Sequence, residues 1–85
     1  MEHTSSKHEF ENLCHNIIWL RDFHRLSKKD MAKLLEISLY TLNRLERGEI
    51  PPRLSVESLF FVSDHFHIPP YRLLTSRLDE DEPMP

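Results

Sequence analysis

The chain has 85 residues, of which 39% are hydrophobic and only one is glycine. This length allows one small domain with a modest core, and the composition favours helices over a sheet that would need glycine-bearing turns. Cys14 is the single cysteine and has no partner for an intramolecular disulfide, which favours a reducing, cytoplasmic setting. We therefore predict an all-α protein.

The formal net charge of −3 hides an uneven distribution along the chain. Four of the 14 acidic groups stand at residues 79–82, which leaves 10 acidic against 11 basic groups in the rest. Residues 21–53 hold eight basic and five acidic groups and form the only basic segment. Affinity for nucleic acid, if present, must therefore come from this segment.

Both ends of the chain are polar, and no apolar run approaches the roughly 20 residues of a membrane-spanning helix. We expect no signal segment and no membrane partner. Residues 1–8 predict a flexible N-terminal arm, residues 9–78 the folded domain, and residues 79–85 an acidic disordered tail. A further hypothesis is that the tail carboxylates at 79–82 fold over the basic segment.

The first helix is expected at about residues 9–24, and later helix starts are marked by an apolar residue followed by serine. A serine hydroxyl accepts a hydrogen bond from an amide of the first turn, and the apolar residue packs as a hydrophobic staple. The pattern occurs at Ser27, Ser38 and Ser55. Pro69 and Pro70 mark a fourth start, because proline suits the first helical turn. The later helices are expected at about 28–35, 39–47, 56–66 and 70–77.

Only Glu36 and Ile37 separate the second helix from the serine that caps the third. A connection this short makes the two helices cross steeply, as in a helix-turn-helix unit. On the first helix, one stripe at helical spacing carries Phe10, Leu13, Cys14, Ile17, Leu20 and Arg21. On the third, Leu42, Leu45 and Glu46 share one side.

Two opposite charges, Arg21 and Glu46, therefore point toward the core. A lone buried charge is costly, so we expect the two to form an ion pair inside the domain. The alternative is that each is solvated separately at the margin.

The opposite face of the third helix is polar and basic, with Tyr40, Arg44 and Arg47 flanked by Thr41 and Asn43. Arginine can read guanine with two hydrogen bonds, asparagine can read adenine, and tyrosine or threonine can contact phosphate or a thymine methyl group. This face has the chemistry for a major groove. An exposed helix face that is merely solvated is the alternative.

Residues 13–74 resemble the Cro and phage-repressor family of helix-turn-helix domains, also called the XRE family. The resemblance rests on Leu20 and Arg21, on residues 26–35 (LSKKDMAKLL) and on residues 37–48 (ISLYTLNRLERG). Residues 55–74 are similar to the last two helices of the family. The resemblance implies a five-helix, lambda-repressor-like domain that regulates transcription as a repressor. Its third helix would lie in the major groove of a double-stranded operator, usually as a homodimer.

The resemblance also assigns roles to individual residues. It implies base contacts from Leu39, Tyr40, Asn43 and Arg44. It implies phosphate contacts from Lys28, Thr41, Arg47 and Arg53, and the neighbouring Lys29 is a further candidate for a phosphate contact. Arg21 with Glu46 matches a buried ion pair of the family. The family usually has glycine at position 36, where the turn tends toward a left-handed conformation, so Glu36 is expected to cost about 1 kcal/mol.

Aromatic residues outside the predicted core are candidates for a dimer interface or for a protein partner. The aromatic candidates are Trp19, Phe23, Phe60, Phe61 and Tyr71, and Pro69 is a further candidate. The alternative is that they pack under the ends of the chain. The competing function is a protein-interaction module, or an antitoxin-like partner protein, that keeps the fold with weak or lost DNA binding. Leu39, Tyr40 and the negative net charge favour that alternative.

The sequence gives no reason to expect an enzyme, a metal or a cofactor. His65 and His67 are two residues apart and face different directions on a helix, which is unsuited to a metal site. The chain has no glycine-rich phosphate loop, no nucleophile elbow and no paired carboxylates in a plausible pocket. We therefore expect no catalytic residues.

Overall fold

The computed structural model describes residues 4–49 and 56–80, with side chains from His8 onward, and these ranges are all-α. Five helices follow one another along the chain. They are α1 (Thr4–Phe23), α2 (Lys28–Leu35), α3 (Leu39–Glu46), α4 (Val56–Phe66) and α5 (Pro70–Thr75). No helix in the described ranges is both long and apolar enough to cross a membrane.

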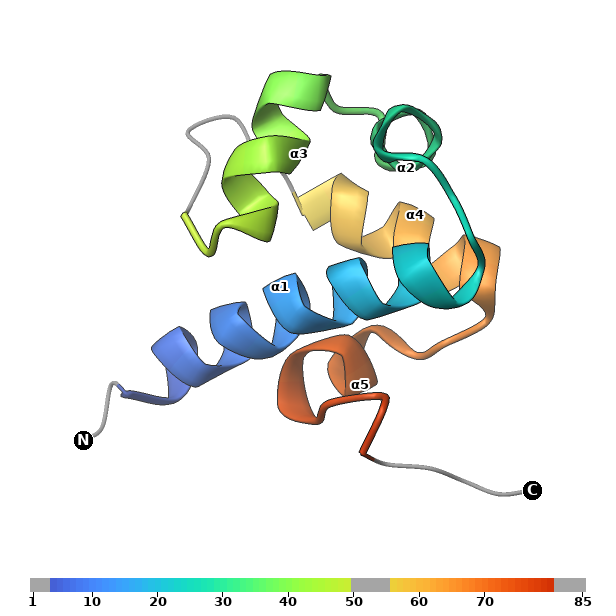
Figure 1. The fold of residues 1–85 in the computed structure, drawn as a ribbon. Coiled ribbons are helices and arrows are strands. Elements are labelled where there is room, and N and C mark those ends of the chain that lie inside the picture. The colour runs from blue at the N-terminus through green and yellow to red at the C-terminus, as the bar shows by residue number, and fades with distance from the viewer. Residues whose placement is uncertain (1–3, 50–55, 81–85) are drawn as a thin grey trace.

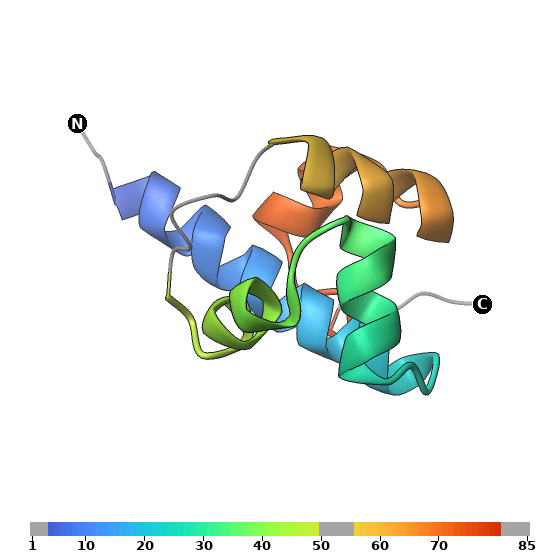
Figure 2. The same ribbon diagram turned by 90° about the horizontal axis from the view of Figure 1, so that it is seen from above.

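The long helix α1 runs through the middle of the molecule, with α3 on one side of it and α5 on the other (Figure 1). Helix α2 packs against α3 and α4, and α4 also contacts α5. Figure 2 shows the short connection between α2 and α3 from above. The arrangement leaves the outer side of α3 away from α1 free of covering helices.

Local capping explains why α2, α3 and α5 begin where the sequence predicts. The hydroxyl of Ser27 accepts a hydrogen bond from the amide of Asp30, and that of Ser38 from the amide of Thr41, both at 3.0 Å. Helix α5 starts on Pro70, whose missing amide proton is not needed in the first turn. Ser55, predicted to cap α4, lies outside the described residues.

Two helices have an end that differs from the prediction by more than one residue. Helix α1 begins at Thr4, where the sequence analysis placed a flexible arm over residues 1–8. Neither proline nor glycine interrupts residues 4–9, so the helical backbone can continue in the N-terminal direction. Helix α5 ends at Thr75 and not at 77, because Ser76 is extended, with φ −147° and ψ 162°.

Helices α1 to α4 are each followed, one or two positions after the last helical residue, by a residue with left-handed backbone. These residues are Arg25, Glu36, Gly48 and His67, with φ between 57° and 81°. The amide of the next residue donates to a carbonyl five positions back, at 2.8 to 3.0 Å. The four donors are Leu26, Ile37, Glu49 and Ile68. This Schellman arrangement pairs a carbonyl that the helix end would leave open, and it reverses the chain with one glycine and three other residues.

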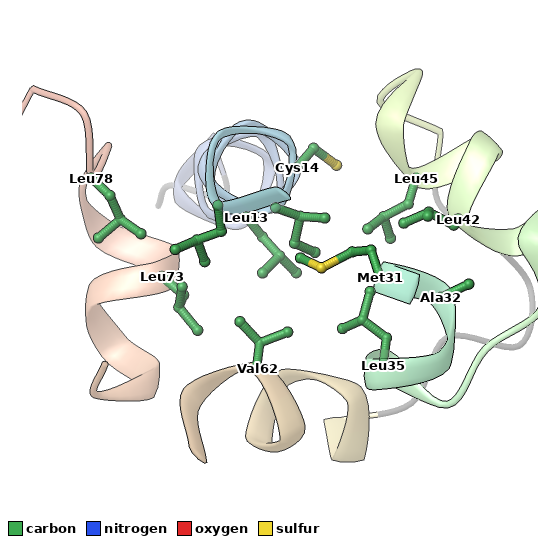
Figure 3. Close-up of a cluster of buried hydrophobic side chains, with 12 residues drawn as sticks. Leu13, Cys14, Met31, Ala32, Leu35, Leu42, Leu45, Val62, Leu73 and Leu78 are labelled. Carbon is green, nitrogen blue, oxygen red and sulfur yellow. The ribbon is translucent and has the colours of Figure 1, made fainter. Parts of the chain in front are cut away.

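Apolar side chains from all five helices meet between α1 and the other helices (Figure 3). The buried residues are Leu13, Cys14, Ile17, Leu20, Met31, Ala32, Leu35, Leu42, Leu45, Val62, Leu73 and Leu78. The stripe predicted on α1 is buried from Leu13 to Leu20, and so are Leu42 and Leu45 of α3. Burial of these two leucines determines which side of α3 faces outward.

One buried polar residue, Asn16 of α1, was not singled out from the sequence. Its amide nitrogen donates to the carbonyls of Leu73 (2.9 Å) and Ser76 (2.8 Å), and its oxygen accepts from the amide of Leu78 (2.9 Å). Asn12, one turn earlier, donates to the carbonyl of Leu74 at 2.8 Å. The two amides thus pair backbone groups at the C-terminal end of α5 and attach that helix to α1.

Candidate nucleic-acid interface

The outer face of α3 presents the residues that the sequence analysis associates with base contacts. Leu39 and Tyr40 are 46% and 66% exposed, and Asn43 and Arg44 are half-buried. Because 3.6 residues complete each turn, this face lies opposite the buried Leu42 and Leu45. The four candidates therefore share one accessible surface.

An ion pair between α1 and α3 holds this surface in place. The Nε atom of Arg21 donates to one carboxylate oxygen of Glu46 at 2.7 Å, and Nη2 donates to the other at 3.2 Å. The side chains are only 18% and 9% exposed, so the expected internal pair is formed and the two groups are not solvated separately. The hydrogen bond to Glu46 raises the pKa of Arg21, which keeps the guanidinium charged.

The first residue of α2 reaches the outer face of α3. The Nζ atom of Lys28 donates to the amide oxygen of Asn43 at 3.1 Å and lies 4.0 Å from a carboxylate oxygen of Glu46. An amide whose oxygen is occupied in this way has its NH2 group left to act as a donor. Lys28 thus connects the start of α2 to the polar residues of α3.

The arginines of this face are linked through Glu49, a residue that the sequence analysis did not select. One carboxylate oxygen of Glu49 lies 3.7 Å from Nη2 of Arg44, and the other accepts from Nε of Arg47 at 3.2 Å. Nη1 of Arg44 also donates to the hydroxyl of Tyr40 at 3.2 Å. The hydrogen bond from Arg47, and then the charges of both arginines, hold the pKa of Glu49 below its usual value, so the group is ionised at neutral pH.

Arg44 has a further polar atom that is not matched by the protein. Its Nε atom is buried and has no hydrogen-bond partner among the described residues. Buried donors without a partner are rare in folded proteins. The guanidinium carbon also lies 5.7 Å from the centre of the Tyr40 ring, so the two side chains are stacked loosely on the face.

The residues predicted to contact phosphate surround this face in part. Lys28 and Lys29 are exposed at the start of α2, and Arg47 is exposed at the end of α3. Thr41 is half-buried, and its hydroxyl accepts from that of Ser38 at 2.9 Å. Lys29 and Leu39 line one shallow hollow of about 490 Å³ between α2 and α3. Arg53 lies outside the described residues.

The aromatic candidates for an interface divide into two groups. Phe23, Phe60, Pro69 and Tyr71 are exposed. Trp19 and Phe61 are half-buried and less available than the sequence analysis expected. Trp19 packs on the core and stacks on Phe23 with 4.9 Å between ring centres. Phe61 lines a hollow of about 540 Å³ that Leu26 and Leu34 also line.

The first carboxylate of the acidic tail does not lie on the basic face. An oxygen of Asp79 is 2.8 Å from Nε2 of His15 on α1, a residue outside the basic segment 21–53. The hypothesis that residues 79–82 cover the basic segment is therefore contradicted for Asp79, because the docking of α5 on α1 determines where the tail leaves the domain. Residues 81 and 82 lie outside the described ranges.

The described ranges contain no group of three histidine, cysteine or acidic side chains that could hold a metal ion. Comparison of the chain with protein-family models, with curated proteins and with solved structures finds no match. The functional proposal therefore depends on the geometry of α2 and α3.

Proposed function

We propose that the protein binds double-stranded DNA in a sequence-specific manner and represses transcription. In this proposal α2 and α3 form a helix-turn-helix unit in a lambda-repressor-like domain of the Cro and phage-repressor family, and α3 enters the major groove. The observation that carries the proposal is the outer face of α3, where Tyr40, Asn43 and Arg44 are accessible beside Lys28 and Arg47. A rigid helix face with this chemistry suits base edges and flanking phosphates.

Each side chain has a role that its position supports. Arg44, whose side chain is 30% exposed on this face, is the candidate for guanine, and Asn43, whose oxygen is occupied by Lys28, offers amide donors to a base acceptor. Leu39 and Tyr40 are placed for apolar contact with a thymine methyl group. The proposed phosphate contacts come from Lys28, Lys29, Thr41, Arg47 and Arg53. The positive end of the α2 dipole, where the two lysines stand, adds to the attraction for a phosphate.

The proposal includes a homodimer on two half-sites about one DNA turn apart. The exposed side chains of Phe60 and Tyr71 support α4 and α5 as the contact surface, together with Val56, which lies one turn before Phe60 and is also exposed. Apolar groups of this size gain from burial against a second copy. The proposed activity is binding alone, without catalysis or a cofactor.

The test is selection of a preferred duplex from a random pool, followed by binding measurements on Arg44→Ala and Arg47→Ala. Loss of Arg44 should relax preference at one base position by about 1–3 kcal/mol. Loss of Arg47 should weaken binding to all sequences alike and reduce the salt slope by about one. Arg77→Ala is the matched control, because Arg77 is exposed, follows α5 in the chain and lies close enough to Asp79 to affect its charge.

The competing function is a protein-interaction module or an antitoxin-like partner with the same fold. It is favoured by the exposure of Leu39 and Tyr40 on α3, which is unusual for a purely polar reading face. If the wild-type chain binds no duplex even at low salt, the DNA-binding proposal is excluded and the interaction module takes its place. Equal behaviour of all three arginine variants on a duplex that does bind would contradict the assigned roles.

A further inference from the structure

The end of α3 differs from the ends of the other three helices that close with a left-handed residue. At the next position, α1, α2 and α4 place Leu26, Ile37 and Ile68, which pack against the core. An apolar residue is usual there, because it covers the last turn of the helix. Helix α3 places Glu49 at this position, and its side chain is 45% exposed.

The backbone of the turn directs Glu49 toward the arginines. The amide of Glu49 donates to the carbonyl of Arg44 at 3.0 Å, and that of Gly48 donates to the carbonyl of Leu45 at 3.0 Å. Gly48 has a φ of 81°, a conformation that glycine adopts at little cost. The turn therefore fixes the Glu49 backbone one helical turn from Arg44 and close to Arg47.

The carboxylate of Glu49 is shared between two cationic groups. One oxygen faces Arg44 at 3.7 Å, and the other accepts from Arg47 at 3.2 Å. Carboxylate and phosphate oxygens compete for the same guanidinium donors, because both are anionic acceptors of similar geometry. Among the described carboxylates on this side of the molecule, Glu46 is already paired with Arg21, which leaves Glu49 as the group facing these two arginines.

We propose that Glu49 is an internal substitute for DNA phosphate that suppresses non-specific binding. The inference rests on the proposed DNA-binding function. In the free protein Glu49 holds Arg44 and Arg47, so docking on any duplex must first separate at least one of them from the carboxylate. On a duplex of random sequence, Arg47 only exchanges the Glu49 carboxylate for a DNA phosphate. At a preferred site Arg44 also gains paired hydrogen bonds to a base, which offsets the exchange.

Glu49 is thus a positioning residue that increases discrimination without touching DNA. Removal of the Glu49 carboxylate should strengthen binding to random duplex, whereas removal of a residue that binds DNA should weaken it. This effect also differs from a general charge effect, which any exposed carboxylate would produce.

The experiment compares wild type, Glu49→Gln and Glu57→Gln as full chains. Glu57 is exposed in the first turn of α4, so both variants lose one negative charge but only one of them frees the arginines. Fluorescence anisotropy is measured on a labelled random duplex at about 50 and about 200 mM salt, where phosphate contacts are distinguished by their salt slope. Glu49→Ala is included as a second variant, and circular dichroism verifies that each chain is folded.

Glu49→Gln and Glu49→Ala should bind random duplex about three- to tenfold more tightly than wild type at the lower salt, with a steeper salt slope. Their ratio of preferred to random affinity should fall by a similar factor, whereas Glu57→Gln should change binding less than about twofold. If wild type binds DNA and both Glu49 variants match Glu57→Gln, the inference is overturned and the proposed function stands. If none of the chains binds any duplex, both are overturned.

Discussion

Asn16 is the most deeply buried polar residue in the described ranges. It is completely buried and makes three hydrogen bonds to backbone groups at and after the end of α5. Helix α5 has six residues, which is too short to be stable in isolation. Its place against α1 therefore depends on these bonds as well as on the burial of Leu73.

Replacing Asn16 by alanine should lower the free energy of unfolding by about 3 kcal/mol, because three buried backbone groups lose their partner at once. Asn12→Ala is the matched control, since Asn12 makes one hydrogen bond to α5 and should cost about 1 kcal/mol. Urea denaturation followed by circular dichroism gives both values. Equal losses in the two variants would mean that apolar packing alone holds α5.

At the level of the helices, the sequence predicts the left-handed residue after some helices and not after others. Glu36 was expected in this conformation from the resemblance and adopts it, with φ 59° and ψ 43°. Arg25 and His67 adopt it without such a signal. Helix starts were predictable because serine hydroxyls and proline act within one turn. The left-handed residues after α1 and α4 were not predictable, because this conformation is stabilised when the following residues, Leu26 and Ile68, pack against the core.

Glu36→Gly should stabilise the protein by up to about 1 kcal/mol, because glycine removes the steric cost of the left-handed backbone. Lys33→Gly is the control within the same helix. Lys33 is exposed in the last turn of α2, where the backbone is still helical and glycine should instead destabilise by up to about 1 kcal/mol. Thermal unfolding distinguishes the opposite signs. A loss of stability in both variants would show that Glu36 is not strained.

On the scale of the whole molecule, the helical period was enough to predict which side of α3 faces outward and that Arg21 and Glu46 meet. Both follow from spacing and from the cost of burying a lone charge. The contact of Glu49 with two arginines was beyond such reasoning, because it depends on the turn at Gly48 and on side-chain geometry. The pairing of Asp79 with His15 could not be predicted from the sequence either, since it requires α5 to dock on α1.

Ionisation of the Cys14 thiol should make the free energy of unfolding of the whole domain depend on pH. Cys14 lies in the core between α1 and the neighbouring helices, and this burial, with a smaller effect from the charge of Glu11, raises the pKa of the thiol to about 11 (Figure 3). An unfolded chain has an ordinary thiol pKa of about 8.5, so the unfolded state loses its proton first as the pH rises. The stabilising effect of the raised pKa is complete below that value and is lost as the pH approaches 11.

Urea denaturation of wild type should therefore show a loss of about 2 kcal/mol or more between about pH 8 and about pH 11 that Cys14→Ala does not share. Tyrosines and lysines titrate in both proteins, so the difference between the two curves isolates the thiol. Cys14→Ala is less stable at neutral pH because it leaves a small cavity, and the gap should narrow with rising pH. Parallel curves would show that the thiol reaches solvent in the folded state, in which case a thiol reagent would label Cys14 without unfolding.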